Sequence, residues 1–444
     1  MTSFHRASGP SRIRLLRDLP GVRRNMPAYM VDLANEFGET VYIPIRYPTY
    51  ILRNPEDVKY ILVNNPKNYH KAGSLKVGKE LFGNGLVSGE PPLHTQQRRI
   101  MQPMFHRQSI SRLGESVVDD ALKHISGWQN GAVIDLAEEM MALTLTIVGK
   151  VLFSVDLHRD AREIGNAFLT AERLVVRRML SVPIPLWVPT PSNTLYRKVI
   201  AQIDHFVFQL ISNRRKTEDQ PGDLLSMLMG ARFEDGTAMS DQQMRDELVT
   251  LLAAGHETVA NTFDWTWHLL SHHPEVEQKL IEEWQRVLGG RNPTMEDIPA
   301  LTYTDLVLTE SMRLYPPAWI LARRAIGPDQ LPSGLEVRIG DELMLSPYVQ
   351  HRHPRYFTDP DSFIPERWTP EFRKSLPGGV YFPFGMGTRY CIGEQLAKME
   401  LMMVLPTIGQ KIKLIEVPGQ AVQPEALITM RPKDGLKMEV SYRA

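Results

Sequence analysis

The segment Phe384-Gly-Met-Gly-Thr-Arg-Tyr-Cys-Ile-Gly393 decides how the rest of the chain is interpreted. It places a sulfur in a glycine-rich turn, just before a run whose periodicity predicts a helix to about Ile408. Glycine tolerates positive φ and lets the backbone approach a flat ligand closely. A thiolate beside a helix N-terminus gains from the helix dipole, which lowers its pKa. Cys391 is therefore a candidate ligand, and Arg389 could pair with a carboxylate on the same bound molecule.

Cys391 is the only cysteine among 444 residues, which excludes an internal disulfide and fits a reducing compartment. A lone cysteine is usually an inert buried thiol. The whole segment argues against that interpretation, because it resembles the Phe-x-x-Gly-x-Arg-x-Cys-x-Gly motif of the cytochrome P-450 family. A chance match to the five fixed positions is on the order of one in a hundred thousand. The resemblance implies that Cys391 binds the iron of haem b (iron protoporphyrin IX).

The resemblance covers the chain from about residue 20 to its end and implies one cytochrome P-450 domain over residues 1–444 around a buried haem. Residues 1–24 are basic and are expected to form an N-terminal extension. The residue patterns predict a mainly α protein with a small β portion and with coil from His353 to Phe384. The expected strands are Thr40–Ile45, Thr49–Leu52, Glu336–Ile339 and Glu342–Leu345, and the expected helices include Pro27–Phe37, Asp241–Ser271, Glu275–Leu288 and Tyr303–Leu314.

Glu310 and Arg313 share one helical face because they are three residues apart. Such pairs are often solvated salt bridges of little energetic weight. Glu310-Ser-Met-Arg313 is, however, similar to the Glu-x-x-Arg helix of the family. The resemblance implies a buried network in which Arg367 joins this pair and braces the cysteine loop.

Several cationic or donor groups are implied as ligands of the haem propionates. His94 and Arg98 resemble the His-x-x-x-Arg helix of the family, although a lone His–Arg pair is more often simply surface. Arg323 falls where the family places another propionate ligand, and the adjacent Arg324 fits the same description. Lys76 lies where some relatives use a lysine. Arg389 completes the set.

The segment Ala254-Gly-His-Glu-Thr258 matches the Ala/Gly-Gly-x-Asp/Glu-Thr motif of the family. Splitting dioxygen needs protons, so the resemblance implies that Thr258 bonds the iron-bound oxygens and that Glu257 relays protons from solvent. A glycine at this point is expected to let the helix distort locally. The alternatives are a threonine bonded to its own backbone and a surface acid. Many relatives carry Thr or Ser where this chain has Val259.

The candidate substrate pocket is nearly all apolar, so we expect an apolar lipid, terpenoid or carotenoid substrate. Leu314–Leu321 and Leu345–Val349 are similar to bacterial carotenoid hydroxylases and, more distantly, to fatty-acid hydroxylases. Trp319 fits a core position equally well. By family position the lining residues are Leu86, Val87, Leu251, Ala254, Ala318, Trp319, Ile320, Leu427 and Ile428.

Composition limits the partners of the chain. Lys+Arg and Asp+Glu are balanced at 51 each, which argues against nucleic acid as a partner. The most apolar stretch contains threonines and charges, so no membrane span is expected and the location is predicted to be cytoplasmic. Little chain follows Arg431-Pro432, so electrons are expected from a separate ferredoxin or flavodoxin with its reductase. Two interpretations fit four basic residues equally well: a cationic docking face for an acidic electron donor, or ordinary solvated charges. The residues are Arg99, Arg107, Arg112 and Lys398.

The lead hypothesis is an oxygen-dependent haem-thiolate monooxygenase. A second hypothesis keeps the fold but uses hydrogen peroxide directly or performs other haem-thiolate chemistry. Glu257-Thr258 argues against the second, because peroxide-using relatives tend to lose that pair. The third is a haem-binding sensor without catalysis, which would have no need for an acid–alcohol pair beside the metal.

Overall fold

The computed structural model of the chain describes residues 7–45, 47–73, 77–106, 109–110, 113–181, 184–217 and 221–443. Contacts between Cα atoms divide the chain into two compact units. Unit 1 consists of Met1–Gly73, Leu306–Cys391 and Gln423–Lys433, and unit 2 consists of Ser74–Asp305, Ile392–Val422 and Asp434–Ala444.

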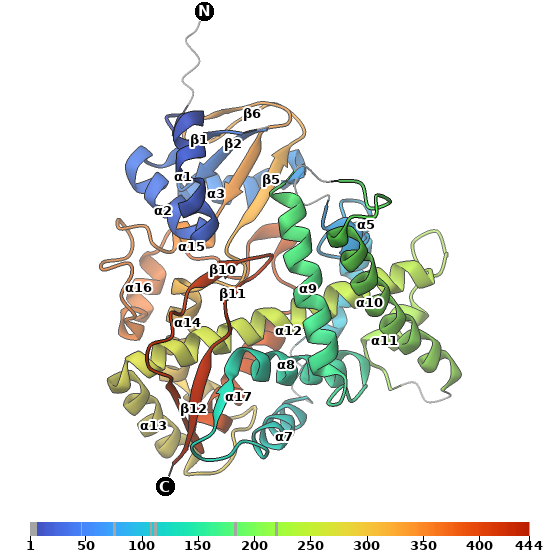
Figure 1. Cartoon of the computed structure of the whole chain (residues 1–444), viewed down its shortest axis with the longest axis vertical. Helices are drawn as coiled ribbons and strands as arrows, with labels where there is room; N and C mark the ends of the chain where they lie inside the picture. The colour runs from blue at the N-terminus through green and yellow to red at the C-terminus, as the bar shows by residue number, and fades with distance from the viewer. Residues whose placement is uncertain are drawn as a thin grey trace, which may run out of the picture. The chain divides into compact units, whose positions relative to one another are not determined.

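Unit 1 contains a five-stranded sheet of order β1-β2-β8-β5-β3, of which Figure 1 labels β1, β2 and β5. The strands β2 and β8 run parallel, and every other neighbouring pair is antiparallel. Apolar side chains of the sheet, among them Leu52, Leu343 and Leu345, form a buried cluster. The strands are β1 (Thr40–Pro44), β2 (Pro48–Leu52), β3 (Tyr69–Lys71), β5 (Leu321–Ala325) and β8 (Glu342–Leu345), with the separate pairs β6 (Asp329–Gln330) with β7 (Glu336–Val337) and β10 (Pro424–Ala426) with β11 (Met430–Pro432).

The helices of unit 1 begin at capping side chains or prolines. The Asn25 side chain accepts the N–H of Ala28 at the start of α2, and Gly38 ends this helix with a φ of 96°. Thr369 caps α16 in the same way, so a short helix interrupts the coil that was expected there. The helices are α1 (Arg12–Arg24), α2 (Met26–Phe37), α3 (Pro55–Lys59), the π-turn η1 (Tyr60–Asn64), the 3-10 turns η2 (Pro66–Asn68), η6 (Pro365–Arg367) and η7 (Gly387–Arg389), α15 (Pro347–Gln350) and α16 (Pro370–Ser375); α14 (Thr302–Leu314) spans the boundary between the units.

Unit 2 is built around α12 (Asp241–His272), which is buried along most of its length and packs against α8 (Leu136–Phe153). Ser240 caps α12 by accepting the N–H of Gln243. The hydroxyl of Thr144 in α8 donates to the carbonyl of His256, 3.0 Å away, and links the two helices. The long apolar helix predicted from the sequence is therefore confirmed to within one residue.

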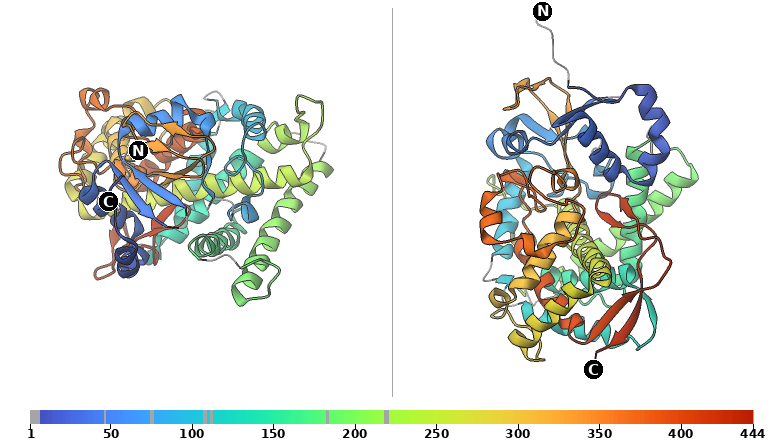
Figure 2. Two further views of the ribbon diagram at one scale, coloured as in Figure 1. Left: turned by 90° about the horizontal axis from the view of Figure 1, so that it is seen from above. Right: turned by 90° about the vertical axis from the view of Figure 1, so that its left-hand side faces the viewer.

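The other helices of unit 2 surround this pair, and the strands β9 and β12 lie side by side near the C-terminus (Figure 2). They are α4 (Lys79–Phe82), α5 (Leu93–Met101), η4 (Gln102–Phe105), α7 (Gly114–Ile125), α9 (Ala161–Met179), α10 (Pro191–Lys216), α11 (Leu224–Gly230), α13 (Pro274–Leu288), η5 (Ile298–Ala300) and α17 (Glu394–Gly409), with a sheet of β4 (Val133–Asp135), β12 (Lys437–Tyr442) and β9 (Ile412–Glu416).

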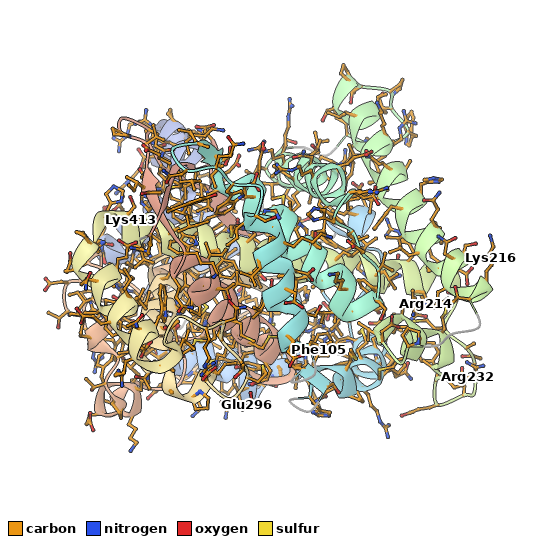
Figure 3. The ribbon with its side chains drawn as sticks, turned by 90° about the horizontal axis from the view of Figure 1, so that it is seen from below. Phe105, Arg214, Lys216, Arg232, Glu296 and Lys413 are labelled. Atoms are coloured by element: carbon orange, nitrogen blue, oxygen red, sulfur yellow. The ribbon has the colours of Figure 1, made fainter. Side chains whose placement is uncertain are left out.

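Arg214, in the last turn of α10, links this helix to neighbouring elements; Figure 3 labels it together with Lys216. Its guanidinium donates to the carboxylate of Asp223, the capping residue of α11, at 2.6 Å. It also donates to the carbonyl of Phe153 at 2.5 Å. One buried cation thus joins the ends of α8, α10 and α11.

None of the described helices combines the length and the apolar character that crossing a bilayer requires.

Candidate functional site

The cysteine loop is held in a tight turn by its own backbone. The N–H of Gly385 donates to Phe382 O at 3.0 Å, and the N–H of Cys391 donates to Phe384 O at 2.9 Å. Gly385 and Gly387 have φ of 73° and 68°, which other residues rarely adopt. A Cβ on Gly387 would also lie 1.9 Å from the carbonyl oxygen of Leu62. The turn therefore requires glycine, and it leaves the thiol of Cys391 exposed.

A buried ion-pair network lies beside this loop in unit 1, as the sequence predicted. The carboxylate of Glu310 accepts two hydrogen bonds from Arg313, both at 2.8 Å, and one from Arg367 Nε at 2.9 Å. The indole N–H of Trp368 donates to it at 2.8 Å. The side chains of Glu310 and Arg313 are fully buried. Each charge is thus paired in a place where an unpaired charge would be costly.

His351 connects this network to the cysteine loop, and sequence reasoning missed it. Arg313 Nη1 donates to the carbonyl of His351 at 2.9 Å, and the N–H of Phe382 donates to His351 Nε2 at 3.0 Å. Burial and the neighbouring Arg313 guanidinium hold the pKa of His351 well below its ordinary value. The ring is therefore neutral and can accept at Nε2. Nothing in Gln350-His-Arg-His353 distinguishes this histidine by sequence from its neighbour.

The implied propionate ligands are divided between the two units. Arg323, on β5, is 8% exposed, and Arg389 is half-buried on η7 in unit 1. In unit 2, α5 carries the buried His94 one turn before the half-buried Arg98. Their assignment to the propionates stays a prediction. Lys76 lies outside the described residues.

Arg324, the other candidate next to Arg323, is engaged elsewhere in unit 1. Its guanidinium lies over the ring of Tyr47, 4.9 Å from the ring centroid. A cation held in this way is less available to a carboxylate. The contact favours Arg323 as the propionate ligand.

One face of α12 is open although the helix is otherwise deeply buried. Ala254 is exposed and Gly255 and Thr258 are half-buried, whereas Leu251 and Glu257 are 6% and 3% exposed. The small residues leave room for a flat apolar molecule against the helix. Glu257 is not a surface acid, so that alternative is wrong. Thr258 Oγ1 donates to the carbonyl of Ala254 at 2.8 Å, as the alternative for threonine anticipated.

The prediction that α12 is distorted at Gly255 is wrong, because the chain is α-helical without interruption from Asp241 to His272. A Cβ on Gly255 would lie 3.0 Å from Cγ2 of Val148 in α8. The glycine therefore serves the close packing of the two helices.

The loop Gly83–Leu86 is fastened to the first turns of α12 by two acids that the sequence did not single out. The N–H of Asn84 donates to Asp246 Oδ2 at 2.8 Å, and the N–H of Leu86 donates to Glu247 Oε2 at 2.9 Å. Burial raises the pKa of Glu247 to about 8, against the opposing effect of the Leu86 N–H. The only sign of these two acids in the sequence is the polar start of the otherwise apolar α12. A polar helix start is equally typical of an end that lies in solvent.

The pocket candidates lie on several elements. Leu86 is buried and Val87 is exposed, both next to this loop. In unit 1, Ala318, Ile320 and Ile428 are half-buried.

Trp319 belongs to a buried apolar cluster of unit 1. Its indole N–H donates to the carbonyl of the buried Leu427 at 2.9 Å, which brings the two predicted segments together. Trp319 therefore occupies a core position, as the alternative interpretation expected. A contact of Trp319 or Leu427 with substrate stays a prediction.

Two of the cations proposed for donor docking already have acidic partners. Lys398 Nζ lies 2.8 Å from Glu394, and Arg99 lies 3.2 Å from Glu234. The Arg99–Glu234 pair is largely exposed and Lys398 is about half exposed, which favours ordinary solvated charges. Arg107 and Arg112 lie outside the described residues.

The comparison with protein families decides what this arrangement is. The cytochrome P450 family model matches residues 8–439. The chain belongs to the cytochrome P450 family. The crystal structure of the cytochrome P450DA haem domain is similar to it, with a TM-score of 0.88 and 25% identity over 98% of this chain and 97% of that one.

Three curated relatives of this P450 are named as oxygenases. Cyclooctat-9-en-7-ol 5-monooxygenase of Streptomyces melanosporofaciens is 36% identical over 83% of this chain and 81% of its own length. Pentalenene oxygenase of Streptomyces avermitilis is 33% identical, with 94% and 93% covered. Chloroplastic carotene epsilon-monooxygenase of Arabidopsis thaliana is 30% identical, with 96% and 83% covered. The chain is a P450 monooxygenase.

The cofactor of this P450 is haem b, and the described residues fit it. In unit 1 the glycine turn presents the exposed thiol of Cys391, the donor type that haem-thiolate iron requires. In unit 2 the open face of α12 offers small side chains rather than bulky ones. Cys391 would hold the iron, and in unit 1 Arg323 and Arg389 would pair with propionates.

Proposed function

We propose that this P450 inserts one oxygen atom from dioxygen into an apolar terpenoid or carotenoid. The observation that carries the proposal is that three relatives with long coverage are named for oxidising cyclooctat-9-en-7-ol, pentalenene and carotene. The apolar character of the predicted lining, such as Leu86 and Leu251, supports such a substrate.

Bound haem supplies the redox centre at which dioxygen is activated, and the chain supplies position and protons. Cys391 would hold the iron as a thiolate, the strong donor that haem needs to activate dioxygen. Thr258 Oγ1, on the open face of α12, would hold a proton for oxygen activation. Its bond to Ala254 O uses the hydroxyl hydrogen, and the same oxygen can also accept a hydrogen bond. Glu257, buried one residue earlier, relays protons from solvent to this position.

A ferredoxin or flavodoxin with its reductase is the proposed source of electrons, because P450 monooxygenases use redox partners. Location in the cytoplasm stays a prediction, supported by the single cysteine, which excludes an internal disulfide.

Substrate identity is tested by titrating terpenes, carotenoids and fatty acids into the ferric enzyme and following the Soret band. A terpenoid or carotenoid that shifts the band and is oxidised with a ferredoxin, a reductase and NADPH supports the proposal. Preference for fatty acids would overturn the substrate class. Equal turnover with hydrogen peroxide and no reductase would overturn the oxygen-dependent mechanism.

The proton role of Thr258 is tested with Thr258→Ala against Thr262→Ala. Both threonines donate to a carbonyl four residues earlier at 2.8 Å, but Thr262 is buried on α12. We expect Thr258→Ala to lower product formed per electron roughly a hundredfold and to raise peroxide release, with Thr258→Ser restoring coupling. Thr262→Ala should stay coupled. Unaltered coupling in Thr258→Ala would remove the proton role.

A further inference from the structure

The last turns of α12 and the end of β9 bring three potential metal ligands together in unit 2. His268 and His272 are four residues apart, so their rings lie on one face of the helix. His268 Nδ1 is 2.6 Å from Glu416 Oε2, and His272 Nδ1 is 3.8 Å from the same oxygen. One ligand atom from each residue lies within 4.8 Å of the other two. Figure 3 labels Lys413, three residues before Glu416 on the same strand.

We propose that His268, His272 and Glu416 form a binding site for a divalent transition metal, with Zn²⁺ as the best match. Two imidazoles and one carboxylate are a donor set that zinc takes in proteins, with water as a fourth ligand. Ligand atoms in a tetrahedral zinc site lie roughly 3.3 Å apart, which small side-chain rotations here would reach. His272 is 52% exposed, which gives the ion and its water a path from solvent.

Neighbouring groups orient the ligands as metal sites require. His272 Nδ1 lies 2.9 Å from the carbonyl oxygen of His268; when Nδ1 donates there, Nε2 carries the free lone pair. The N–H of Glu416 donates to Ser271 Oγ at 3.0 Å and fixes the end of β9. The ring of Trp265 meets that of His268 edge to face, 5.7 Å between centroids. Each of the three ligands thus has a contact that helps to hold it before any metal binds.

A simple histidine–carboxylate pair does not account for this cluster. His124 and Glu139 form such a pair, and that carboxylate also pairs with Arg162. Glu416 instead has two histidines facing it, with ring centroids 4.8 Å apart. The second ring, at 3.8 Å, adds no hydrogen bond to the carboxylate. A shared cation would bring both rings and the carboxylate to one centre.

The bound ion would fasten the end of α12 to β9. Because it would bind the folded chain only, it would raise thermal stability by mass action. Its binding rests on these three residues and not on the proposed function.

The test is a titration of holoenzyme, prepared without a polyhistidine tag and stripped with EDTA, with ZnCl₂ in a calorimeter. We expect one saturable zinc per chain, and a rise in melting temperature with zinc. His272→Ala should weaken zinc binding by at least roughly tenfold. Glu416→Gln keeps a hydrogen-bond acceptor but removes the charge, and should weaken it as well. His205→Ala, an exposed histidine on α10, is the matched control and should bind as the parent does.

The carbon monoxide spectrum of each variant verifies that it is folded before zinc is added. No saturable site in the parent enzyme would overturn the proposal. So would undiminished binding in both His272→Ala and Glu416→Gln, or an equal loss in His205→Ala.

Discussion

Glu310 in unit 1 and Glu247 in unit 2 are both fully buried, but different hydrogen-bond donors offset the cost of burying their carboxyl groups. Glu310 accepts hydrogen bonds from the guanidiniums of Arg313 and Arg367. Glu247 Oε2 accepts the N–H of Leu86, while its Oε1 has no hydrogen-bond partner among the described residues. In these contacts, the hydrogen-bond donors to Glu310 are positively charged, whereas the donor to Glu247 is a neutral backbone N–H.

The difference teaches what each acid can do. A carboxylate that accepts hydrogen bonds from two guanidiniums suits a permanent brace for the cysteine loop. A buried carboxyl with a pKa of about 8 is largely protonated at neutral pH, and its hold on the Gly83–Leu86 loop changes with pH.

The largest effect is expected from Glu310→Ala. The change leaves the guanidiniums of Arg313 and Arg367 buried without their carboxylate, which costs about 3–5 kcal/mol. Urea unfolding of the holoenzyme measures it. Arg215→Ala, which breaks an exposed pair with Asp241, should change the free energy of unfolding by less than about 1 kcal/mol. Equal losses of unfolding free energy in the two variants would contradict the claim that the buried network stabilises the protein more than an exposed ion pair does.

Glu247→Gln should change the pH dependence of stability. The folded pKa is raised above its ordinary 4.5, so the stabilising contribution of the protonated acid is fully present below pH 4.5 and is lost as pH rises through about 8. Relative to the glutamine variant, the parent should lose on the order of 1 kcal/mol per pH unit in that interval. Unfolding free energies at several pH values test this. A difference that does not vary with pH would contradict the assignment, and exposed Glu234→Gln serves as control.

A smaller effect is expected from Gly83→Ala. Its φ is 55°, and a Cβ there would lie 2.1 Å from the carboxylate of Asp246, so the loop must move off α12. We expect a loss of about 1–3 kcal/mol and weaker substrate binding, measured by unfolding and by Soret titration. Gly289→Ala is the matched control, because its φ is 58° and a Cβ meets nothing within 4 Å. If both variants lose the same stability, backbone strain rather than the loop contact explains the effect.

The cysteine loop and the Glu310 network could be predicted because their chemistry fixes residue types at fixed spacing. Cys391, Arg389 and Gly387 lie within five residues, so the segment carries its own signal. The strands β1 and β2 were also predicted to within one residue, since they are neighbouring segments on either side of a turn.

Contacts between distant segments could not be predicted in this way. His351 matters because it meets Arg313 and Phe382, which lie 38 and 31 residues away. Glu247 meets Leu86 across 161 residues. Gly255 was assigned to a helix distortion because its packing partner Val148 lies on another helix. Each role depends on tertiary packing that periodicity does not report.

The most direct test of the central claim, that Cys391 ligates the haem, is the absorption spectrum of the reduced protein under carbon monoxide. The parent should show the red-shifted Soret band of a thiolate ligand, and Cys391→Ser should lack it while binding at most haem in another ligation state. Thr258→Ala should retain the band, because that residue lies on α12 and not at the iron ligand. A parent without the red-shifted band, or a serine variant that keeps it, would contradict the account.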